Sequence, residues 1–224
     1  MTGVITAAIG DIHGMRDHLA RLLREIAAYT QSQNWSEYPR LVFLGDYVDR
    51  GPASREVVRL LRHLHDQGAV CLRGNHEEMM ARCRSGPLAM SQFLANGGVA
   101  TLASYAERPE DFDEDRRWMA ALPTSYEDDL RIFVHAGLMP RRPLDVQDDQ
   151  TKLWIRDKFL NFDGAFPKYV VHGHTPVQYS GLEAAPEIRT NRCDLDTGAC
   201  YGGTLSVAFF DEHTAAPFHT ISVR

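Results

Sequence analysis

The stretch VITAAIGDIHG at residues 4–14 begins with a short apolar run and ends in a polar loop bounded by glycines. An apolar run of this length, closed by Gly10, is typical of a buried strand. Apolar side chains then recur at helical spacing, at Leu19, Leu22 and Ile26. The segment therefore predicts a strand, a loop and a helix in that order.

The same order of elements recurs twice more in the first half of the chain. LVFL at 41–44 leads through a loop with Gly, Asp and Pro into a helix with apolar positions over 57–64. AVCL at 69–72 leads through Gly74 into another helix. Alternating strands and helices predict βαβ units and a largely parallel sheet.

The second half of the chain is richer in strands and has one clear helix, near 152–160. Its apolar runs predict strands at 131–134, 169–171, 205–210 and 219–223. The predicted fold class is mixed α/β, with two packed sheets in a β-sandwich flanked by helices. No internal repeat, low-complexity tract or long linker divides the sequence, so we expect a single domain over residues 1–224.

A polar stretch between Gly86 and Ser125 shows only weak periodicity. It contains the acidic run ERPEDFDED at 107–115. Charge runs of this kind usually lie on a solvated face, so we expect a surface excursion here.

The composition, 44% hydrophobic and 24% charged, is that of a globular protein. The 24 basic and 30 acidic residues give a formal charge of −6, which argues against phosphate-dominated nucleic-acid binding and against an anionic membrane surface. The apolar run at 4–9 is too short for a membrane span and lacks the features of a secretory signal. We expect a cytoplasmic protein that binds neither nucleic acid nor membrane, with a monomer as the default state.

Polar clusters stand at the ends of successive apolar runs, where open α/β sheets place their ligand sites. The clusters are GDIHG at 10–14, GDYVDRG at 45–51, RGNHE at 73–77, HAG at 135–137 and HGHT at 172–175. Each motif alone is weak, because a single His at a strand end is more often a core residue. Together they offer oxygen and imidazole ligands to one rim, and such a mixed set suits divalent Mn, Fe or Zn.

In order and spacing, these motifs resemble the phosphoprotein phosphatase (PPP) family of metallophosphatases, specifically its small bacterial serine/threonine branch. Further similarity lies in LWIR at 153–156 and in DTG at 196–198. The resemblance implies a metallophosphoesterase-like sandwich and two divalent metal ions, with Mn²⁺ expected and Fe or Zn as alternatives.

The resemblance also implies which residues hold the ions. The implied ligands are Asp11 and His13 for the first ion, Asp46 as the bridge, and Asn75, His135 and His174 for the second. In related enzymes the ligand of the HGH motif follows the glycine, which selects His174 and leaves His172 as a supporting or core residue.

The implied catalytic residues surround the phosphate. His76 would protonate the leaving oxygen, and Asp49 would orient its imidazole. Arg50 and Arg156 resemble the phosphate clamps of the family, since a guanidinium group donates two hydrogen bonds to phosphate oxygens. Tyr201 is either a neighbour of the phosphate or an aromatic side chain packed under a glycine turn.

The implied activity is hydrolysis of phosphomonoesters, with phosphorylated Ser or Thr side chains of proteins or peptides as substrates. One alternative is symmetrical hydrolysis of dinucleoside tetraphosphates, although the enzymes that perform it often carry Gln in place of His13. A second is a catalytically silent phosphate-binding module, which usually lacks a ligand or the acid. The stretches 86–125 and 139–149 follow motif-bearing segments, and we expect them to determine substrate choice. Arg73 is left outside the core set because it can orient other groups without touching substrate.

Overall fold

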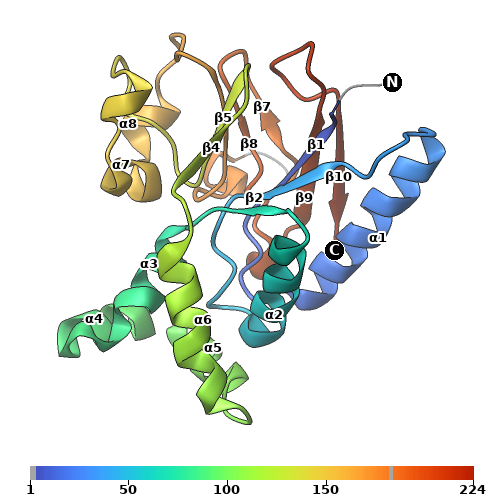
Figure 1. Ribbon diagram of the computed structural model, residues 1–224. Coiled ribbons are helices and arrows are strands. Elements are labelled where there is room, and N and C mark those ends of the chain that lie inside the picture. The colour runs from blue at the N-terminus through green and yellow to red at the C-terminus, as the bar shows by residue number, and fades with distance from the viewer. Residues whose placement is uncertain (1–3, 182–183) are drawn as a thin grey trace.

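Two five-stranded β-sheets pack face to face in the computed structural model, which describes residues 4–181 and 184–224 (Figure 1). Ala8 and Val42 of the first sheet share a buried apolar cluster with Phe133 and Val171 of the second. Helices flank both sheets. This arrangement confirms the predicted mixed α/β sandwich.

The first sheet has the strand order β10-β9-β1-β2-β3. Its strands are β1 (Thr6–Ile9), β2 (Arg40–Phe43), β3 (Val70–Cys71), β9 (Leu205–Phe210) and β10 (His219–Val223). β1, β2 and β3 run parallel, as their alternation with helices predicted, and β9 pairs antiparallel with both β1 and β10. All four residues of β1 are buried, because one face of the strand packs on helices and the other on the second sheet.

The second sheet has the strand order β4-β5-β6-β8-β7. Its strands are β4 (Ser125–Glu127), β5 (Arg131–Val134), β6 (Tyr169–His172), β7 (Glu187–Ile188) and β8 (Arg192–Asp194). β5, β6 and β8 are parallel, and β4 and β7 are antiparallel edge strands. Sequence analysis missed β4, β7 and β8 because strands of two or three residues are too short to show an apolar pattern.

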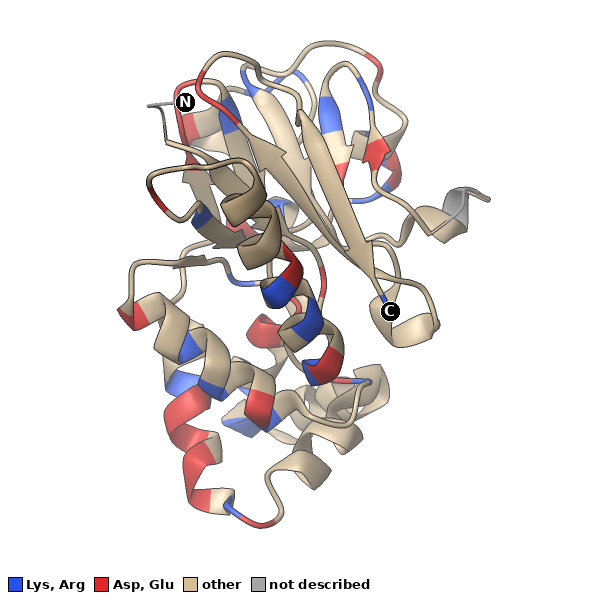
Figure 2. Ribbon diagram, turned by 90° about the vertical axis from the view of Figure 1, so that its right-hand side faces the viewer, with Lys and Arg blue, Asp and Glu red and all other residues tan. Residues whose placement is uncertain are grey.

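α1 (Arg16–Ser32) and α2 (Ser54–Asp66) pack against the first sheet. Leu19, Leu22 and Ile26 of α1 join Ala7 and Phe209 in one buried apolar cluster, so the helical spacing seen in the sequence marks the buried face. Charged residues are frequent on the helices in the lower part of Figure 2. In the described ranges, no helix is both long and apolar enough to cross a lipid bilayer.

The stretch between Gly86 and Ser125 is mostly helical, an organisation that its weak periodicity did not indicate. It follows α3 (Asn75–Arg82) and comprises α4 (Pro87–Phe93), a π turn at Leu94–Gly98, α5 (Val99–Ser104) and α6 (Pro109–Ala121). These helices project below the sheets in Figure 1.

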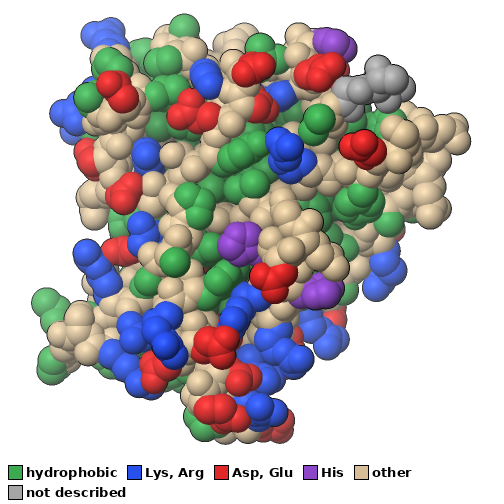
Figure 3. Space-filling model, in the orientation of Figure 1, with side chains coloured by type: hydrophobic (Ala, Val, Ile, Leu, Met, Phe, Trp, Pro, Cys, Tyr) green, Lys and Arg blue, Asp and Glu red, His purple; other side chains and the backbone are tan. Residues whose placement is uncertain are grey.

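The acidic run lies on α6 and pairs with arginines of α2. Arg55 Nη2 is 2.6 Å from Asp111 Oδ2, and Arg62 Nη1 is 2.6 Å from Asp115 Oδ1. Acidic and basic side chains are intermixed over this part of the surface (Figure 3). Most of the run is exposed or partly exposed, as expected of a surface stretch, but Phe112 and Asp115 are buried. Some of its carboxylates also join two helices, a pairing that charge patterning along the chain does not reveal.

The helix predicted near 152–160 is two short helices, α7 (Asp149–Trp154) and α8 (Asp157–Leu160). Asp148 caps α7, since its side chain accepts a hydrogen bond from the backbone N–H of Thr151. Between the helices, Arg156 adopts φ −131° and ψ −104°, outside the helical region. The break lies at the motif that resembles a phosphate clamp.

Candidate active site

The loops that follow β1, β2, β3, β5 and β6 carry the predicted site residues and bring their side chains together. Several of these residues adopt positive φ angles, which residues other than glycine rarely adopt. They are His13 (46°), Asp46 (55°), Asp49 (73°), Arg50 (69°) and His174 (72°). Such strain persists where the surrounding structure imposes it, and it concentrates at functional sites.

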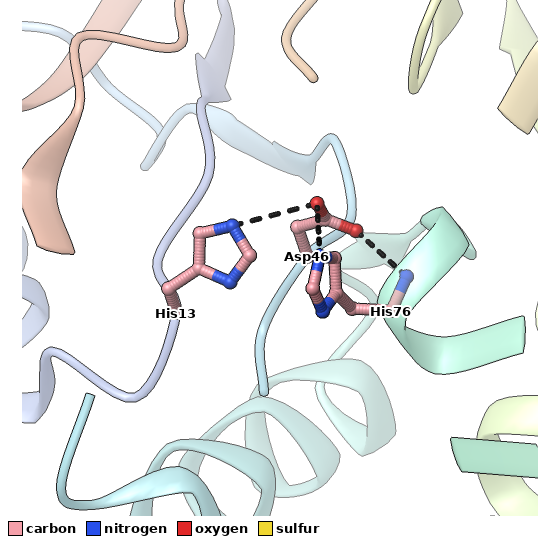
Figure 4. Close-up of side chains that lie close together, drawn as sticks. All are labelled: His13, Asp46 and His76. Carbon is pink, nitrogen blue, oxygen red and sulfur yellow. Dashed lines mark hydrogen bonds and ion pairs between the residues drawn. The ribbon is translucent and has the colours of Figure 1, made fainter. Parts of the chain in front are cut away.

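Asp46 lies at the centre of the cluster, between imidazoles (Figure 4). Its Oδ1 is 3.3 Å from His135 Nε2 and accepts a hydrogen bond from the backbone N–H of His76 at 3.0 Å. Its Oδ2 is 3.5 Å from His13 Nε2. Burial alone would raise the pKa of Asp46, but His135, His76 and His13 outweigh burial and hold that pKa well below its usual range. Asp46 is therefore an ionised carboxylate shared by both halves of the site.

His13 and His135 present the same ring nitrogen to Asp46. His13 Nδ1 lies 2.8 Å from the carbonyl oxygen of Val48, and His135 Nδ1 lies 3.0 Å from that of Leu44. A carbonyl only accepts hydrogen bonds, so each Nδ1 carries a hydrogen, and in the neutral imidazole Nε2 is left with a lone pair that a metal ion could take. Backbone anchoring of this kind orients histidines that bind metal.

Asn75 connects His135 and His174. Asn75 Oδ1 is 2.9 Å from His135 Nε2 and 2.8 Å from His174 Nδ1. The Nε2 of His174 is buried and has no hydrogen-bond partner in residues 4–181 and 184–224. A buried polar atom without a partner is costly, which fits a site built to hold another group.

Two groups of side chains have ligand atoms that all lie within 4.8 Å of one another. They are His13, Asp46 and His76, and Asp46, His135 and His174. The groups share Asp46, and their carboxylate and imidazole atoms suit divalent transition metals. The donor set therefore fits a pair of divalent ions.

Asp11, a predicted ligand, belongs to neither of these groups. Its two carboxylate oxygens accept the backbone N–H of His174 at 3.3 and 3.1 Å. A Cβ at Gly173 would lie 2.1 Å from Asp11 Oδ1, so this close approach requires glycine. Burial and the nearby carboxylate of Asp196 raise the pKa of Asp11 well above its usual range. Asp194 and Asp196 are buried carboxylates to which sequence analysis assigned no role, although Asp196 belongs to the DTG similarity.

His76 and Asp49 form a buried pair with 2.6 Å between Nδ1 and Oδ2. Burial lowers the pKa of His76 to about 4 and raises the pKa of Asp49 to about 8. Together these shifts keep one dissociable proton in the pair at neutral pH, between the carboxylate and Nδ1. Nε2 then carries a hydrogen and lies 3.8 Å from Asp46 Oδ2, on the side of the predicted ligands. The pair has the geometry of an oriented proton donor.

The two predicted phosphate clamps are both exposed. The guanidinium of Arg50 contacts His13 Nε2 and lies 5.4 Å from the centre of the Tyr201 ring. Tyr201 is 57% exposed and lies beside Arg50, so its ring is not buried under the glycine turn. Arg156 donates from Nη1 to Thr175 Oγ1 of the HGHT motif at 3.2 Å.

Glu77 holds two motif loops together, although sequence analysis gave it no role within RGNHE. Its Oε2 accepts the backbone N–H groups of Asp46 at 2.7 Å and Gly74 at 2.9 Å, and its Oε1 accepts that of Tyr47 at 2.7 Å. The side chain is fully buried. A carboxylate that accepts three backbone hydrogen bonds fixes the loop of the central ligand to the start of α3.

We expect Glu77→Gln to lower the free energy of unfolding by about 2–3 kcal/mol, because the new amide NH₂ must face a buried backbone N–H. Urea denaturation measures the change. The matched control is Glu110→Gln, whose carboxylate is 60% exposed and pairs with Arg108; we expect it to leave the stability nearly unchanged, because exposed ion pairs contribute little. Equal effects of the two substitutions would contradict this role.

Two polar residues near the motifs point away from the ligand groups. His172 is fully buried, with Nε2 3.3 Å from Arg192 Nη1, and it packs edge-on against Phe159. Arg73 donates to the carbonyl oxygen of Ala120 at 3.2 Å and pairs with Glu78 at 3.2 Å. His172 is thus a core residue, and Arg73 joins α3 to α6.

Comparison with curated proteins gives relatives of two kinds. The asymmetrical bis(5'-nucleosyl)-tetraphosphatase PrpE of Halalkalibacterium halodurans is 28% identical over 229 residues, covering 91% of this chain and 89% of that protein. Serine/threonine-protein phosphatase 1 of Salmonella typhimurium is 30% identical over 208 residues, covering 89% of each.

Solved structures agree with the fold. A structure provisionally assigned as a diadenosine tetraphosphatase matches with a TM-score of 0.69 and 26% identity, covering 99% of this chain and 94% of that one. A serine/threonine phosphatase from Saccharomyces cerevisiae matches with a TM-score of 0.65 at 15% identity, which shows a shared fold. The model of the calcineurin-like phosphoesterase family matches residues 6–204. The motif order, the shared-carboxylate ligand groups and this match agree: the chain belongs to the calcineurin-like phosphoesterase family, as its resemblance to metallophosphatases predicted.

Proposed function

We propose that this phosphoesterase hydrolyses phosphomonoesters and that phosphorylated Ser and Thr side chains of proteins or peptides are its substrates. The observation that carries the proposal is the buried His76–Asp49 pair, 2.6 Å apart, beside the two ligand groups. An alkoxide released from phosphoserine is a poor leaving group and needs a proton. His76 Nε2 donates that proton to the ester oxygen as its bond to phosphorus breaks, and Asp49 keeps the imidazole oriented.

The proposed metal ligands follow the sequence prediction. Asp11, His13 and Asp46 would hold one ion, and Asp46, Asn75, His135 and His174 would hold the other. Two bound ions supply charge to the phosphoryl oxygens and lower the pKa of water enough to provide a nucleophile near neutral pH. Mn²⁺ is the proposed native ion, with Fe or Zn as alternatives.

Arg50 and Arg156 are proposed to bind the phosphoryl group. Each presents an exposed guanidinium next to a motif loop, Arg50 at GDYVDRG and Arg156 beside the HGHT threonine. A planar guanidinium donates two parallel hydrogen bonds to phosphate oxygens and holds the group for in-line attack.

A cavity of about 420 Å³ supports a peptide substrate. Leu88 and Trp154 provide apolar wall, and Gln92 and Gln150 provide amide groups. Trp154, which lines this cavity, packs edge-on against His174 with 6.3 Å between ring centres. Amides can hydrogen-bond an extended peptide backbone while apolar walls receive its side chains. Leu88 and Gln92 belong to the stretch expected to determine substrate choice.

Hydrolysis of dinucleoside tetraphosphates is a second candidate, because the PrpE relatives cover most of the chain. The names of these relatives specify asymmetrical cleavage, whereas the alternative expected from the sequence was symmetrical cleavage. The presence of His13 instead of Gln argued only against the symmetrical kind. Asymmetrical cleavage of diadenosine tetraphosphate gives ATP and AMP, and symmetrical cleavage gives two ADP.

The test compares substrates on one preparation, stripped of metal and reconstituted with Mn²⁺. Phosphate release is measured from phosphoserine, phosphothreonine and phosphotyrosine peptides, and nucleotide products are measured from diadenosine tetraphosphate. We expect the Ser and Thr peptides to turn over fastest. Faster formation of ATP and AMP would replace the proposal with the second candidate, and no turnover of any substrate would favour the silent phosphate-binding module.

Divalent metal is expected to stabilise the fold. Mn²⁺ at about 100 times its dissociation constant should raise the free energy of unfolding by about 2.7 kcal/mol per site, because it binds the folded protein. It should also offset the repulsion between carboxylates that are buried close together. For a chain of this size that is a rise in Tm of about 5–10 °C per site. Thermal unfolding with Mn²⁺ or with a chelator measures it. An unchanged Tm would contradict the proposed ligand set.

A further inference from the structure

Thr101 of α5 contacts Asp49 from the side opposite His76. Its hydroxyl donates to Asp49 Oδ1 at 2.6 Å, and its oxygen accepts the backbone N–H of Asp49 at 2.8 Å. Thr101 and Asp49 are both fully buried. One hydroxyl thus holds both the carboxylate and the backbone of the residue that orients His76.

The hydrogen bonds around Thr101 have a fixed direction. A hydroxyl has one hydrogen, and that of Thr101 goes to Asp49 Oδ1. Ser54 Oγ lies 3.1 Å from Thr101 Oγ1, so the hydrogen between them must come from Ser54. With Oδ1 held by Thr101, the other oxygen of Asp49 faces His76 Nδ1. The carboxylate therefore has one rotamer compatible with all its partners.

The same helical segment also fixes the next residue, Arg50. Its backbone N–H donates to the carbonyl oxygen of Gly97 at 3.3 Å. Gly97 adopts φ +107°, and a Cβ there would lie 2.8 Å from the Arg50 nitrogen, so the approach depends on glycine. Asp49 and Arg50 both have positive φ, and residues 97–101 supply contacts that hold them there.

We propose that Thr101 is a positioning residue: it holds Asp49 so that His76 can deliver its proton to the leaving oxygen. This role rests on the proposed function, since it has meaning only if His76 is the general acid. The predicted consequence is specific. Loss of the hydroxyl should slow reactions whose leaving group needs a proton and should spare reactions whose leaving group departs as a stable anion.

The test uses the Mn²⁺-loaded full chain and aryl phosphates of rising leaving-group pKa, from p-nitrophenyl phosphate to phenyl phosphate. We expect Thr101→Val to lower kcat on phenyl phosphate by about 10- to 100-fold but on p-nitrophenyl phosphate by less than about 3-fold, with KM unchanged. Thr101→Ser keeps the hydroxyl and should stay within about 3-fold of wild type on both. His76→Asn should show a larger loss of the same kind.

Ser104→Ala is the matched control. Ser104 also lies on α5; its hydroxyl accepts the backbone N–H of Arg55 of α2 at 3.2 Å and donates to the backbone carbonyl oxygen of Thr101 at 2.7 Å, but does not contact Asp49. Its removal tests whether weakening the contact between α5 and α2 is enough to change the leaving-group dependence, and we expect no change. Metal content and thermal unfolding are measured on every variant. If Thr101→Val does not fold, Thr101→Ala, which places no methyl group against the carboxylate, is compared with Thr101→Ser.

The outcomes distinguish the role of Thr101 from the acid role of His76. Equal losses of Thr101→Val on both esters, or none, with His76→Asn sensitive to the leaving group, would overturn the role of Thr101 alone. An insensitive His76→Asn would overturn the acid role and the role of Thr101 with it. A wild-type protein that cleaves none of the esters would remove the proposed function itself.

Discussion

Asp46→Asn is expected to lower kcat by at least about 10³-fold, because Asp46 is shared by both groups of possible metal ligands. Mutation of residues that only hydrogen-bond to metal ligands already lowers metal affinity or activity by about 10- to 100-fold. The substitution keeps the shape of the side chain but removes its negative charge, while the imidazoles of His135 and His13 stay within 3.3 and 3.5 Å. Metal content should fall together with activity. Both are measured on the purified variant, by elemental analysis and by phosphate release.

Asp163→Asn is the matched control, since its carboxylate is 90% exposed and lies 3.5 Å from Arg189. It should keep both metal content and turnover. If Asp46→Asn kept two ions per chain with near-normal turnover, the assignment of Asp46 as the bridge would be wrong.

His76→Asn is expected to lower kcat by about 10²–10⁴-fold on phosphoserine peptides while metal content stays unchanged. The imidazole supplies the proton, and its pairing with Asp49 at 2.6 Å keeps Nε2 directed to the site. Asparagine fills part of the space, but its amide group cannot replace the imidazole as the donor of a proton to the leaving oxygen. Turnover and bound metal are measured on the same sample.

The structure makes the metal measurement decisive, because His76 belongs to one of the groups of possible metal ligands. Loss of one ion in parallel with activity would make His76 a ligand and remove its role as acid. His63→Asn, an exposed substitution on α2, should leave both quantities unchanged.

The fold class and the location of the site could be predicted because both depend on local patterns. Apolar runs such as 41–44 are long enough to mark strands, and the polar residues after them share one sheet edge wherever the strands are parallel. The helices and buried residues of the stretch 86–125 could not be predicted from local patterns. Its buried Phe112 and Asp115 stand among charged residues whose partners on α2 lie about 50 positions earlier in the chain, as with Asp115 and Arg62.

The sequence by itself determined the motif set, the family and the strand–loop–helix order, because these are properties of neighbouring residues and their spacing. Only the tertiary structure decided which groups meet. In the folded chain Glu77 accepts hydrogen bonds from three backbone N–H groups, Thr101 contacts Asp49, and His172 is buried in the core. Thr101 is 52 positions from Asp49 and lies in no motif. Hydrogen bonds between such distant residues depend on how helices pack, and no local pattern along the chain records that packing.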